Sequence, residues 1–372
     1  MHGATTLEKY WWEFPPFIDL KDTSMFNEIE PEQFYSLDYG GSLAKIVYAS
    51  RDSKQQSVTD GSLVRLNLKR FQKIGDCLDF LKKQMQPLKH GSPTNFLVAS
   101  GGAAFQNADF ISDVLCTKVD LFGEMEAIVK GCNFILQKID DGSWTYHHEA
   151  PADQRYQFAT LQSSSIFPYL LVNIGTGISV MKVESETVYS RIGGSTLGGG
   201  AFMGLGSLLV GVHSFEELMA FAEKGDHRSA DLMVSDVYAG PYDESALPAD
   251  LIAASFGRCV SQPLTNENQN KALPMEKADV MKSLLLMLSN SIGQMAMLYA
   301  QVHKLSRIYF GGSFVSPTMM RTISFAVKYW SKGEVEALFL RHSSYIGAIG
   351  AFMQNVEKYK HGENVSVEGK ES

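Results

Sequence analysis

The chain has 372 residues, of which 45% are hydrophobic, enough to bury the cores of two or three domains. Its formal net charge of -8 and its isoelectric point of about 5.6 argue against a general binder of nucleic acids or anionic membranes, because those surfaces attract basic proteins. A local basic pocket remains compatible with this charge.

Residues 1–33 are expected to form an N-terminal extension. They contain acids and no continuous apolar run of the kind found in secretory signals. The chain has four scattered cysteines and no CxxC pair, which is typical of buried, reduced thiols in a cytoplasmic protein. Several aromatic residues are expected to dock onto the body of the protein or onto a partner: Tyr10, Trp11, Trp12, Phe14 and Phe17.

Two strand–turn–strand patterns repeat along the chain. The first begins with "LDYGGSLAKIVYA" at Leu37, and the second with "VNIGTGISVMKVE" at Val172. A third strand is predicted after each, over 62–71 and 187–194. Two β-hairpins of one design favour a duplicated pair of domains, with chance similarity of two glycine hairpins as the alternative.

Helices are predicted between and after these strands. An amphipathic helix is expected from residue 74 to 85, and a second helix begins after Ser214, where Glu217 completes a capping box. The most apolar long segment, 283–302, contains too many polar residues for a lipid-facing span and is predicted to be a buried helix. The polar stretch 261–277 is expected to be a loop and 357–372 a flexible tail. Strands and helices in both halves indicate an α/β protein with mixed sheets.

The first glycine turn, "DYGGSLAK", could grip phosphates. Gly40, Gly41 and Ser42 could offer backbone donors, Lys45 could reach a phosphate, and Asp38 could hold hydrated magnesium. A plain type I′ hairpin is the alternative for this motif alone.

Four more glycine clusters follow strands or precede a helix. Neither a P-loop nor a dinucleotide-binding fingerprint is present, so the pattern indicates another kind of nucleotide cleft. The residues concerned are Gly101 and Gly102; Asn173, Gly175, Thr176 and Gly177; Gly198, Gly199 and Gly200; and Gly311 and Gly312.

The order of these motifs resembles the eukaryotic-type (type II) pantothenate kinases of the actin-like ATPase superfamily. The resemblance covers roughly 34 to 355 and is carried by "LLVNIGTGISVMKV", "RIGGSTLGGGAFMGL", "IAASFG", "NSIGQMA", "YFGGSF", "YWSKGEVEALFL" and "YIGAIGAF". It implies two actin-like (ribonuclease H-like) lobes around a nucleotide cleft. We place them at 34–165 and 166–356, the second with dimerisation elements.

The resemblance also implies an activity and its residues. The expected reaction is ATP-dependent phosphorylation of pantothenate to 4'-phosphopantothenate, the first step of coenzyme A biosynthesis. Glu124 falls at the family's general base, and Arg191 at its substrate-site arginine. Ser195 and Thr196 fall in its pantothenate-contacting turn. Glu126 competes with Glu124, but on a helix the two would diverge by about 200°, so only one is expected to face the cleft.

Regulation is implied as well. Family members are dimers inhibited by acyl-coenzyme A, and their pocket includes residues of the neighbouring subunit. Trp330 and Ala326 fall at those positions, and Tyr238 and Ala254 are expected to border the substrate pocket. The alternative for Trp330 is packing on its own core.

The chain also departs from the family pattern. Ala103 stands where a third glycine is usual, and Ser343 and Ser344 replace an acid and a glycine. These changes suit a second reading, a catalytically weak regulatory subunit paired with a paralogue, whereas the retained Glu124 and Arg191 favour a working kinase, homodimeric or heteromeric. A sugar kinase of the same fold is a third reading, but it would need a sugar-binding acid pair, which is not recognisable.

Overall fold

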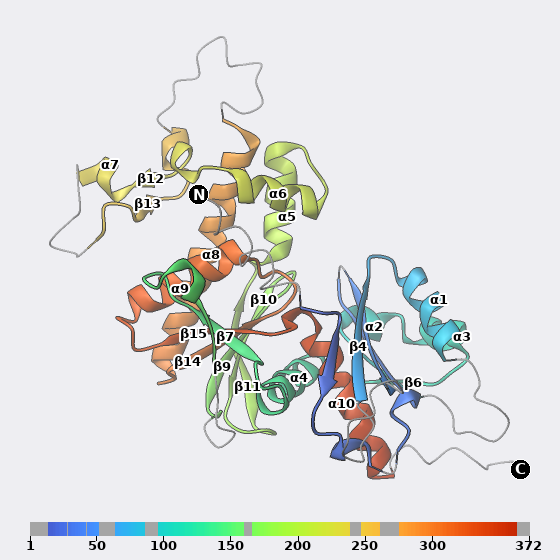
Figure 1. Ribbon diagram of the computed structural model, residues 1–372. Helices are drawn as coiled ribbons and strands as arrows, with labels where there is room; N and C mark the ends of the chain where they lie inside the picture. The colour runs from blue at the N-terminus through green and yellow to red at the C-terminus, as the bar shows by residue number, and fades with distance from the viewer. Residues whose placement is uncertain are drawn as a thin grey trace, which may run out of the picture.

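The computed structural model describes residues 14–27, 29–41, 43–51, 64–85, 96–159, 166–238, 247–260 and 275–362. Tyr10, Trp11, Trp12 and Ser42 lie outside these ranges, as do most of the predicted loop 261–277 and most of the predicted tail. The described chain is an α/β protein with two large sheets, one at each side of a central pair of helices (Figure 1).

The first sheet has six strands in the order β1-β4-β3-β2-β5-β6. Strands β2, β3 and β4 form an antiparallel meander, while β5 and β6 continue parallel to β2. The strands are β1 (Phe17–Leu20), β2 (Phe34–Tyr39), β3 (Ala44–Arg51), β4 (Val64–Phe71), β5 (Phe96–Ser100) and β6 (Val119–Leu121). Helices α1 (Ile74–Gln84), α2 (Gly102–Gln106) and α3 (Ala108–Leu115) accompany this sheet.

The second sheet repeats the arrangement within seven strands, ordered β11-β10-β9-β14-β15-β7-β8. Strands β9, β10 and β11 form the antiparallel meander, and β14 and β15 follow parallel to β9. The strands are β7 (Ser143–Tyr146), β8 (Tyr156–Phe158), β9 (Tyr169–Ile174), β10 (Ile178–Val183), β11 (Tyr189–Ser195), β14 (Arg307–Gly311) and β15 (Glu336–Leu340). The shared topology confirms the predicted duplication of mixed sheets.

Two long helices separate the sheets (Figure 1). Helices α4 (Glu124–Lys138) and α10 (Ile346–Lys360) cross in close contact. The contact is close because each helix presents a glycine: an added Cβ at Gly131 would lie 1.8 Å from the Ile346 carbonyl oxygen, and one at Gly350 would lie 1.8 Å from the Ala127 carbonyl oxygen. Helix α10 is also fixed to the first sheet, where Asn355 Nδ2 donates to the carbonyls of Tyr35 and Phe96 at 3.0 and 2.8 Å.

Three segments lie across the divisions that we drew from the sequence. β1, within the predicted extension, pairs with β4. β7 and β8, which precede residue 165, extend the second sheet through β15. α10, near the end of the chain, packs on β2 and β5. No local sequence pattern in β1, β7, β8 or α10 indicates which sheet the element joins.

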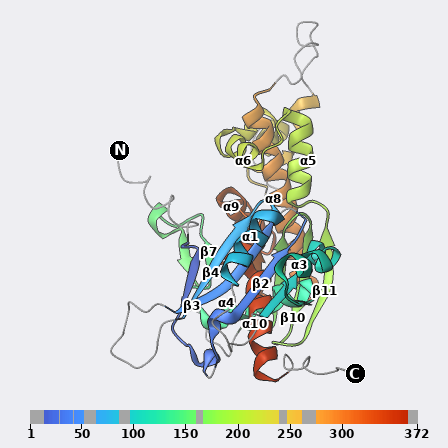
Figure 2. The ribbon, with the colours of Figure 1, turned by 90° about the vertical axis from the view of Figure 1, so that its right-hand side faces the viewer.

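The remaining helices rise from the second sheet. Figures 1 and 2 show α5 (Gly199–Val210) and α6 (Phe215–Lys224) at one end of the molecule, beside α8 (Lys277–Val302). The predicted cap of α6 is confirmed, because Ser214 Oγ accepts from the Glu217 N–H at 3.3 Å. Helix α9 (Pro317–Trp330) packs along α8, while α7 (Val234–Tyr238), β12 (Leu232–Met233) and β13 (Ile252–Ala254) form a small outlying unit.

Helix α8 is long and apolar enough to pass a length and composition test for a membrane span. Leu284, Leu285 and Leu288 are nevertheless buried in the core with strands of the second sheet, as the sequence predicted. The four cysteines are free, but the expectation of burial holds only for Cys77 and Cys132, whereas Cys116 and Cys259 are exposed. Short 3-10 helices cover Ser24–Phe26, Pro31–Gln33, Ala152–Gln154, His227–Ser229, Gly257–Val260 and Ser343–Tyr345.

Candidate active site

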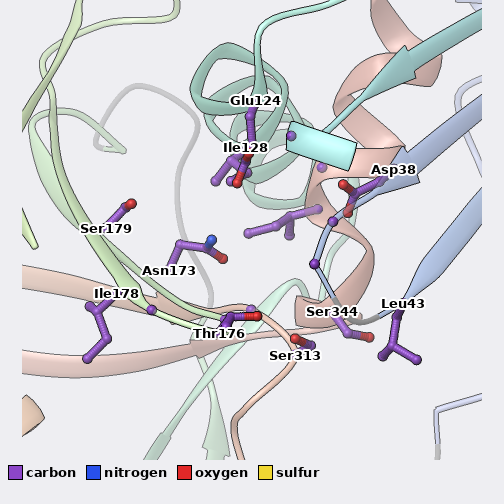
Figure 3. A pocket seen from close by; sticks show the side chains of 18 of the residues that line it. Asp38, Leu43, Glu124, Ile128, Asn173, Thr176, Ile178, Ser179, Ser313 and Ser344 are labelled. Atoms are coloured by element: carbon purple, nitrogen blue, oxygen red, sulfur yellow. The ribbon is translucent and has the colours of Figure 1, made fainter. Parts of the chain in front are cut away.

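A cavity of about 460 Å³ opens between the two hairpins. Both sheets and the first turns of α4 and α10 contribute to it, and Figure 3 shows side chains from opposite walls pointing into it. Its lining consists of Asp38, Gly40, Gly41, Leu43, Lys45, Gly102, Glu124, Ile128, Asn173, Gly175, Thr176, Gly177, Ile178, Ser179, Arg191, Ser195, Thr196, Gly312, Ser313, Ser343, Ser344, Ile346 and Gly347.

The first hairpin supplies one wall. Asp38 at the end of β2 faces Lys45 on β3 in direct register, and Lys45 Nζ lies 3.4 Å from Asp38 Oδ2. Both side chains are largely buried. Two glycines make room for this carboxylate: an added Cβ would lie 3.0 Å from Oδ1 at Gly101 and 3.0 Å from Oδ2 at Gly347. Gly101 also has φ +94°, a backbone conformation that favours glycine.

The second hairpin faces the first. An added Cβ at Gly41 would lie 3.8 Å from Thr176 Oγ1, so the two glycine turns approach each other across the cavity. The Gly175 N–H donates to the Gly177 carbonyl at 2.9 Å, which closes the turn between β9 and β10. Asn173 and Ser179 are opposite each other in this ladder and both line the cavity.

Gly198, Gly199 and Gly200 do not line the cavity, although the sequence suggested that they approach a ligand. The Gly199 and Gly200 N–H groups instead donate to the carbonyls of Gly175 and Thr176 at 2.8 and 2.9 Å. An added Cβ at Gly198 would lie 2.7 Å from the Thr176 carbonyl oxygen. These glycines therefore let the start of α5 rest on the second hairpin turn.

The turn after β14 adds the wall nearest to α10. Gly312 has φ +104°, and an added Cβ would lie 2.3 Å from the Ile174 carbonyl oxygen. Ser343 clamps this turn: its carbonyl accepts from the Gly312 N–H at 3.1 Å and its Oγ donates to the Gly312 carbonyl at 3.2 Å. Gly311 does not line the cavity and packs beside Ile346 and Leu340.

Glu124 is the first residue of α4 and points into the cavity (Figure 3). Desolvation and then the negative charge of Asp38 raise the pKa of its carboxyl, against the lowering effects of a backbone hydrogen bond from Gly102 and of Lys45. Glu126 does not line the cavity. The structure thus separates the two acids as the helical geometry predicted.

Arg191 enters the cavity from β11 next to an irregularity in the ladder. Val180 pairs with Gly193 and Met181 with Arg191, so Ile192 is an extra residue. A bulge of this kind re-aims the side chains around it. Arg191 has no ion-pair partner among the described residues. Its side chain passes close to Gly194, where an added Cβ would lie 2.7 Å from Arg191 Nη2. Ser195 and Thr196 follow it in the lining.

Ala326 and Trp330, expected in a pocket shared with a neighbouring subunit, and Tyr238 and Ala254, expected to border the substrate pocket, do not line this cavity within one chain. Ala326 is buried between α9 and α8, where an added Cβ at Gly293 would meet its own Cβ at 2.8 Å. Trp330 is 40% exposed and lies edge-on to Tyr329. Tyr238 and Ala254 are exposed on α7 and β13.

Sequence reasoning missed several lining residues. Leu43 and Ser179 are next to identified motifs and could have been found from strand alternation. Ile128 lies one helical turn after Glu124, which the helical period would give. Ile346 and Gly347 come from the distant start of α10; the motif "YIGAIGAF" contains them, but no local pattern placed that motif at the cavity. Ser343 and Ser344 were noticed only as departures, and Ala103 lies in α2 outside the lining.

The acidic residues of the cavity decide whether it can hold a magnesium ion. The described residues contain no group of three or more histidine, cysteine or acidic side chains able to hold a metal by themselves. Magnesium bound with a nucleotide needs only one or two carboxylates, because phosphates and water complete its shell. Asp38, with Glu124 nearby in the same cavity, fits that requirement.

Comparisons with known proteins find similar sequences over most of the chain. Residues 34–354 match the family model described as Fumble. The chain is 40% identical to pantothenate kinase 1 of Arabidopsis thaliana over 85% of this chain and 84% of that protein. It is 35% identical to the pantothenate kinase of Schizosaccharomyces pombe over 90% of this chain and 85% of that protein. It is 38% identical to 4'-phosphopantetheine phosphatase of Mus musculus over 93% of this chain, but spans only 44% of that protein.

Proposed function

The chain belongs to the Fumble family, and on that premise we propose that it transfers a phosphoryl group from ATP to pantothenate, which yields 4'-phosphopantothenate in the first step of coenzyme A biosynthesis. The observation that supports this most directly is the convergence of Glu124, Arg191, Asp38 and Lys45 on one cavity. The likeness to pantothenate kinases extends over most of the chain.

Glu124 is the general base in this proposal. The primary hydroxyl of the substrate must lose its proton as it attacks the γ-phosphate, and a carboxylate at the cavity wall can accept it. The raised pKa of Glu124 makes this carboxylate a stronger base than an ordinary glutamate. Proton transfer to a positioned group contributes roughly 10²–10⁴-fold to a rate.

The phosphate chain is bound by the facing glycine turns. Backbone N–H groups at Gly41 and around Thr176 can hold it from both sides, and Lys45 and Arg191 supply positive charge. The Gly40 N–H, which the sequence suggested as a further donor, instead donates to the Leu43 carbonyl within its own turn at 3.3 Å. Asp38 would hold magnesium through water, and the ion when bound offsets negative charge on the phosphates. Since Glu124 and Arg191 are both in the cavity, the alternative of a catalytically weak subunit is not favoured.

The test is ATP-dependent formation of 4'-phosphopantothenate by the purified chain, with Glu124→Gln and Glu126→Gln compared. Both variants remove one acid from the first turn of α4, so they share any effect on the helix N-terminus. We expect kcat to fall at least about 10²-fold only for Glu124→Gln. Equal activity in the two variants would reject Glu124 as the base, and no product from the folded wild-type chain would reject the function.

Assembly and feedback are further parts of the proposal. We place the protein in the cytoplasm as a dimer, or as a heteromer with a paralogue, inhibited by acyl-coenzyme A. The apolar face of α5 supports a dimer, because Leu208 is 84% exposed and Leu205 is 40% exposed. Leu208→Glu is expected to convert the dimer to a monomer in a light-scattering mass measurement. An unchanged mass would contradict dimerisation through α5, and a titration of acetyl-coenzyme A during turnover tests the feedback.

A further inference from the structure

A row of polar residues crosses the first sheet at the edge of the cavity. Asp38 on β2 pairs with Ser100 on β5 and with Lys45 on β3, and Lys45 pairs in turn with Arg70 on β4. Directly paired residues of neighbouring strands project from the same face of a sheet, with Cβ atoms about 5 Å apart. Arg70 therefore follows Lys45 by one strand along this row.

Strand alternation places the row on the face between the two sheets. Along β4, Leu66 and Leu68 belong to the buried cluster that also contains residues of α4 and α10, and Arg70 continues their alternation. Lys69 lies on the other face, where its Nζ is 4.0 Å from the centre of the Phe80 ring of α1. Two adjacent cations are thus directed to opposite sides of the sheet.

Arg70 also lies beside the start of α10. Burial raises the pKa of the Tyr345 hydroxyl, and the charge of Arg70 acts on it in the lowering direction. Tyr345 directly follows Ser344, which lines the cavity. Arg70 is exposed, and no ion pair to it occurs among the described residues. A cation without a carboxylate partner therefore lies next to the mouth of the site.

The charge of the cavity leaves a role for this cation. The ionisable residues of the lining are Asp38 and Glu124 against Lys45 and Arg191, so their formal charges cancel. Lys45 is in addition paired with Asp38. A magnesium–ATP complex still carries net negative charge, and transferring phosphoryl groups are usually bound by surplus positive charge.

We propose that Arg70 is a further phosphate-binding residue of this site, whose guanidinium contacts the phosphate chain of the bound nucleotide beside Lys45. This rests on the proposed kinase function for the identity of the ligand as a nucleoside triphosphate. The planar fork of an arginine can engage two phosphate oxygens at once, which a lysine cannot do.

The experiment measures nucleotide binding directly and so does not depend on turnover of pantothenate. Calorimetry would give the Kd of a non-hydrolysable ATP analogue with magnesium, and that of adenosine, for the wild-type chain, Arg70→Gln, Arg70→Lys and Lys69→Gln. The matched control is Lys69→Gln, since it removes the same charge from the adjacent position on the opposite face.

We expect Arg70→Gln to weaken binding of the analogue by about tenfold, as the loss of a charged hydrogen bond implies, and Arg70→Lys to restore part of it. Adenosine affinity and the pantothenate KM should not change, and Lys69→Gln should match the wild type. Because Arg70 is exposed, the melting temperature should also stay unchanged.

Equal affinities of Arg70→Gln and Lys69→Gln for the analogue would overturn the proposal, as would a parallel loss of adenosine affinity, which would indicate a structural role through Tyr345. A wild-type chain that binds the analogue but makes no phosphopantothenate would reject only the proposed function. A chain that binds no nucleotide would reject both.

Discussion

The crossing of α4 and α10 predicts a linked loss of stability and activity in Gly350→Ala. The added Cβ would lie 1.8 Å from the Ala127 carbonyl oxygen, whereas real Cβ contacts are essentially never below 3.0 Å. The obstacle is backbone, so no side chain can rotate away from it. The helices must therefore separate locally by about 1.2 Å, the difference between those two distances.

This separation has two consequences. Alanine gains about 1 kcal/mol of helix propensity over glycine, but overpacking of a tight contact costs about 1–3 kcal/mol or more, so we expect net destabilisation and a melting temperature lower by a few degrees. Glu124 lies on the same helix as Ala127, one turn earlier, while Gly347 of α10 is so placed that an added Cβ would lie 3.0 Å from Asp38 Oδ2. A shift of about 1 Å between reacting groups can lower a rate about 10²-fold.

The assays are thermal unfolding and steady-state turnover of Gly350→Ala. Gly75→Ala in α1 is the matched control, because an added Cβ there meets nothing within 4 Å. We expect the control to keep wild-type kcat and melting temperature. Wild-type values of both quantities in Gly350→Ala would refute the view that this crossing positions the base, and a lower melting temperature with unchanged kcat would refute the link to Glu124.

Three further predictions concern the cavity. The raised pKa of Glu124 means that this base becomes protonated, and kcat/KM falls, at a higher pH than the usual glutamate value of about 4.3; an acid limb at or below that value in a pH–rate profile would contradict the assignment. Lys45→Met should abolish turnover but leave the circular dichroism spectrum of the folded chain unchanged. Lys182→Met, which removes an ion pair with Glu184, should leave both turnover and the spectrum unchanged. Gly312→Ala should greatly weaken binding of the ATP analogue because of its clash with the Ile174 carbonyl, while Gly333→Ala, at a positive φ with nothing within 4 Å, should lose only about 1 kcal/mol of stability and bind normally.

Much of the site could be predicted because its parts are local. A hairpin turn, a helix cap and the face of a helix depend on residues within a few positions of one another, so the two glycine hairpins and the Ser214 cap followed from local patterns. Spacing predicted that only one of Glu124 and Glu126 faces the cleft, and the family resemblance selected Glu124. The structure places the corresponding cavity residues together.

Long-range packing was outside the reach of that reasoning. Gly347 leaves room for the Asp38 carboxylate, and Ser36 Oγ donates to the Ala348 carbonyl at 2.7 Å, although some three hundred residues separate α10 from β2. The pairing of β1 with β4 and of β7 with β15 likewise depends on which sheet edge is free. Neither the contacts of α10 with β2 nor these strand pairings follow from a local sequence pattern.

The glycines show why sequence alone assigns this site only in part. Because glycine lacks a Cβ, it allows close approach of a ligand and close approach of another backbone segment equally well. The sequence therefore shows glycine in both cases. The surroundings separate them: an added Cβ would meet nothing within 4 Å at Gly40 and Gly102, but would meet the backbone of the second hairpin at 2.7 Å from Gly198 and 3.0 Å from Gly200. Alanine at Gly40 or Gly102 should therefore leave the fold intact and obstruct only the ligand. Alanine at Gly198 should displace the hairpin turn itself, so binding and stability should fall together.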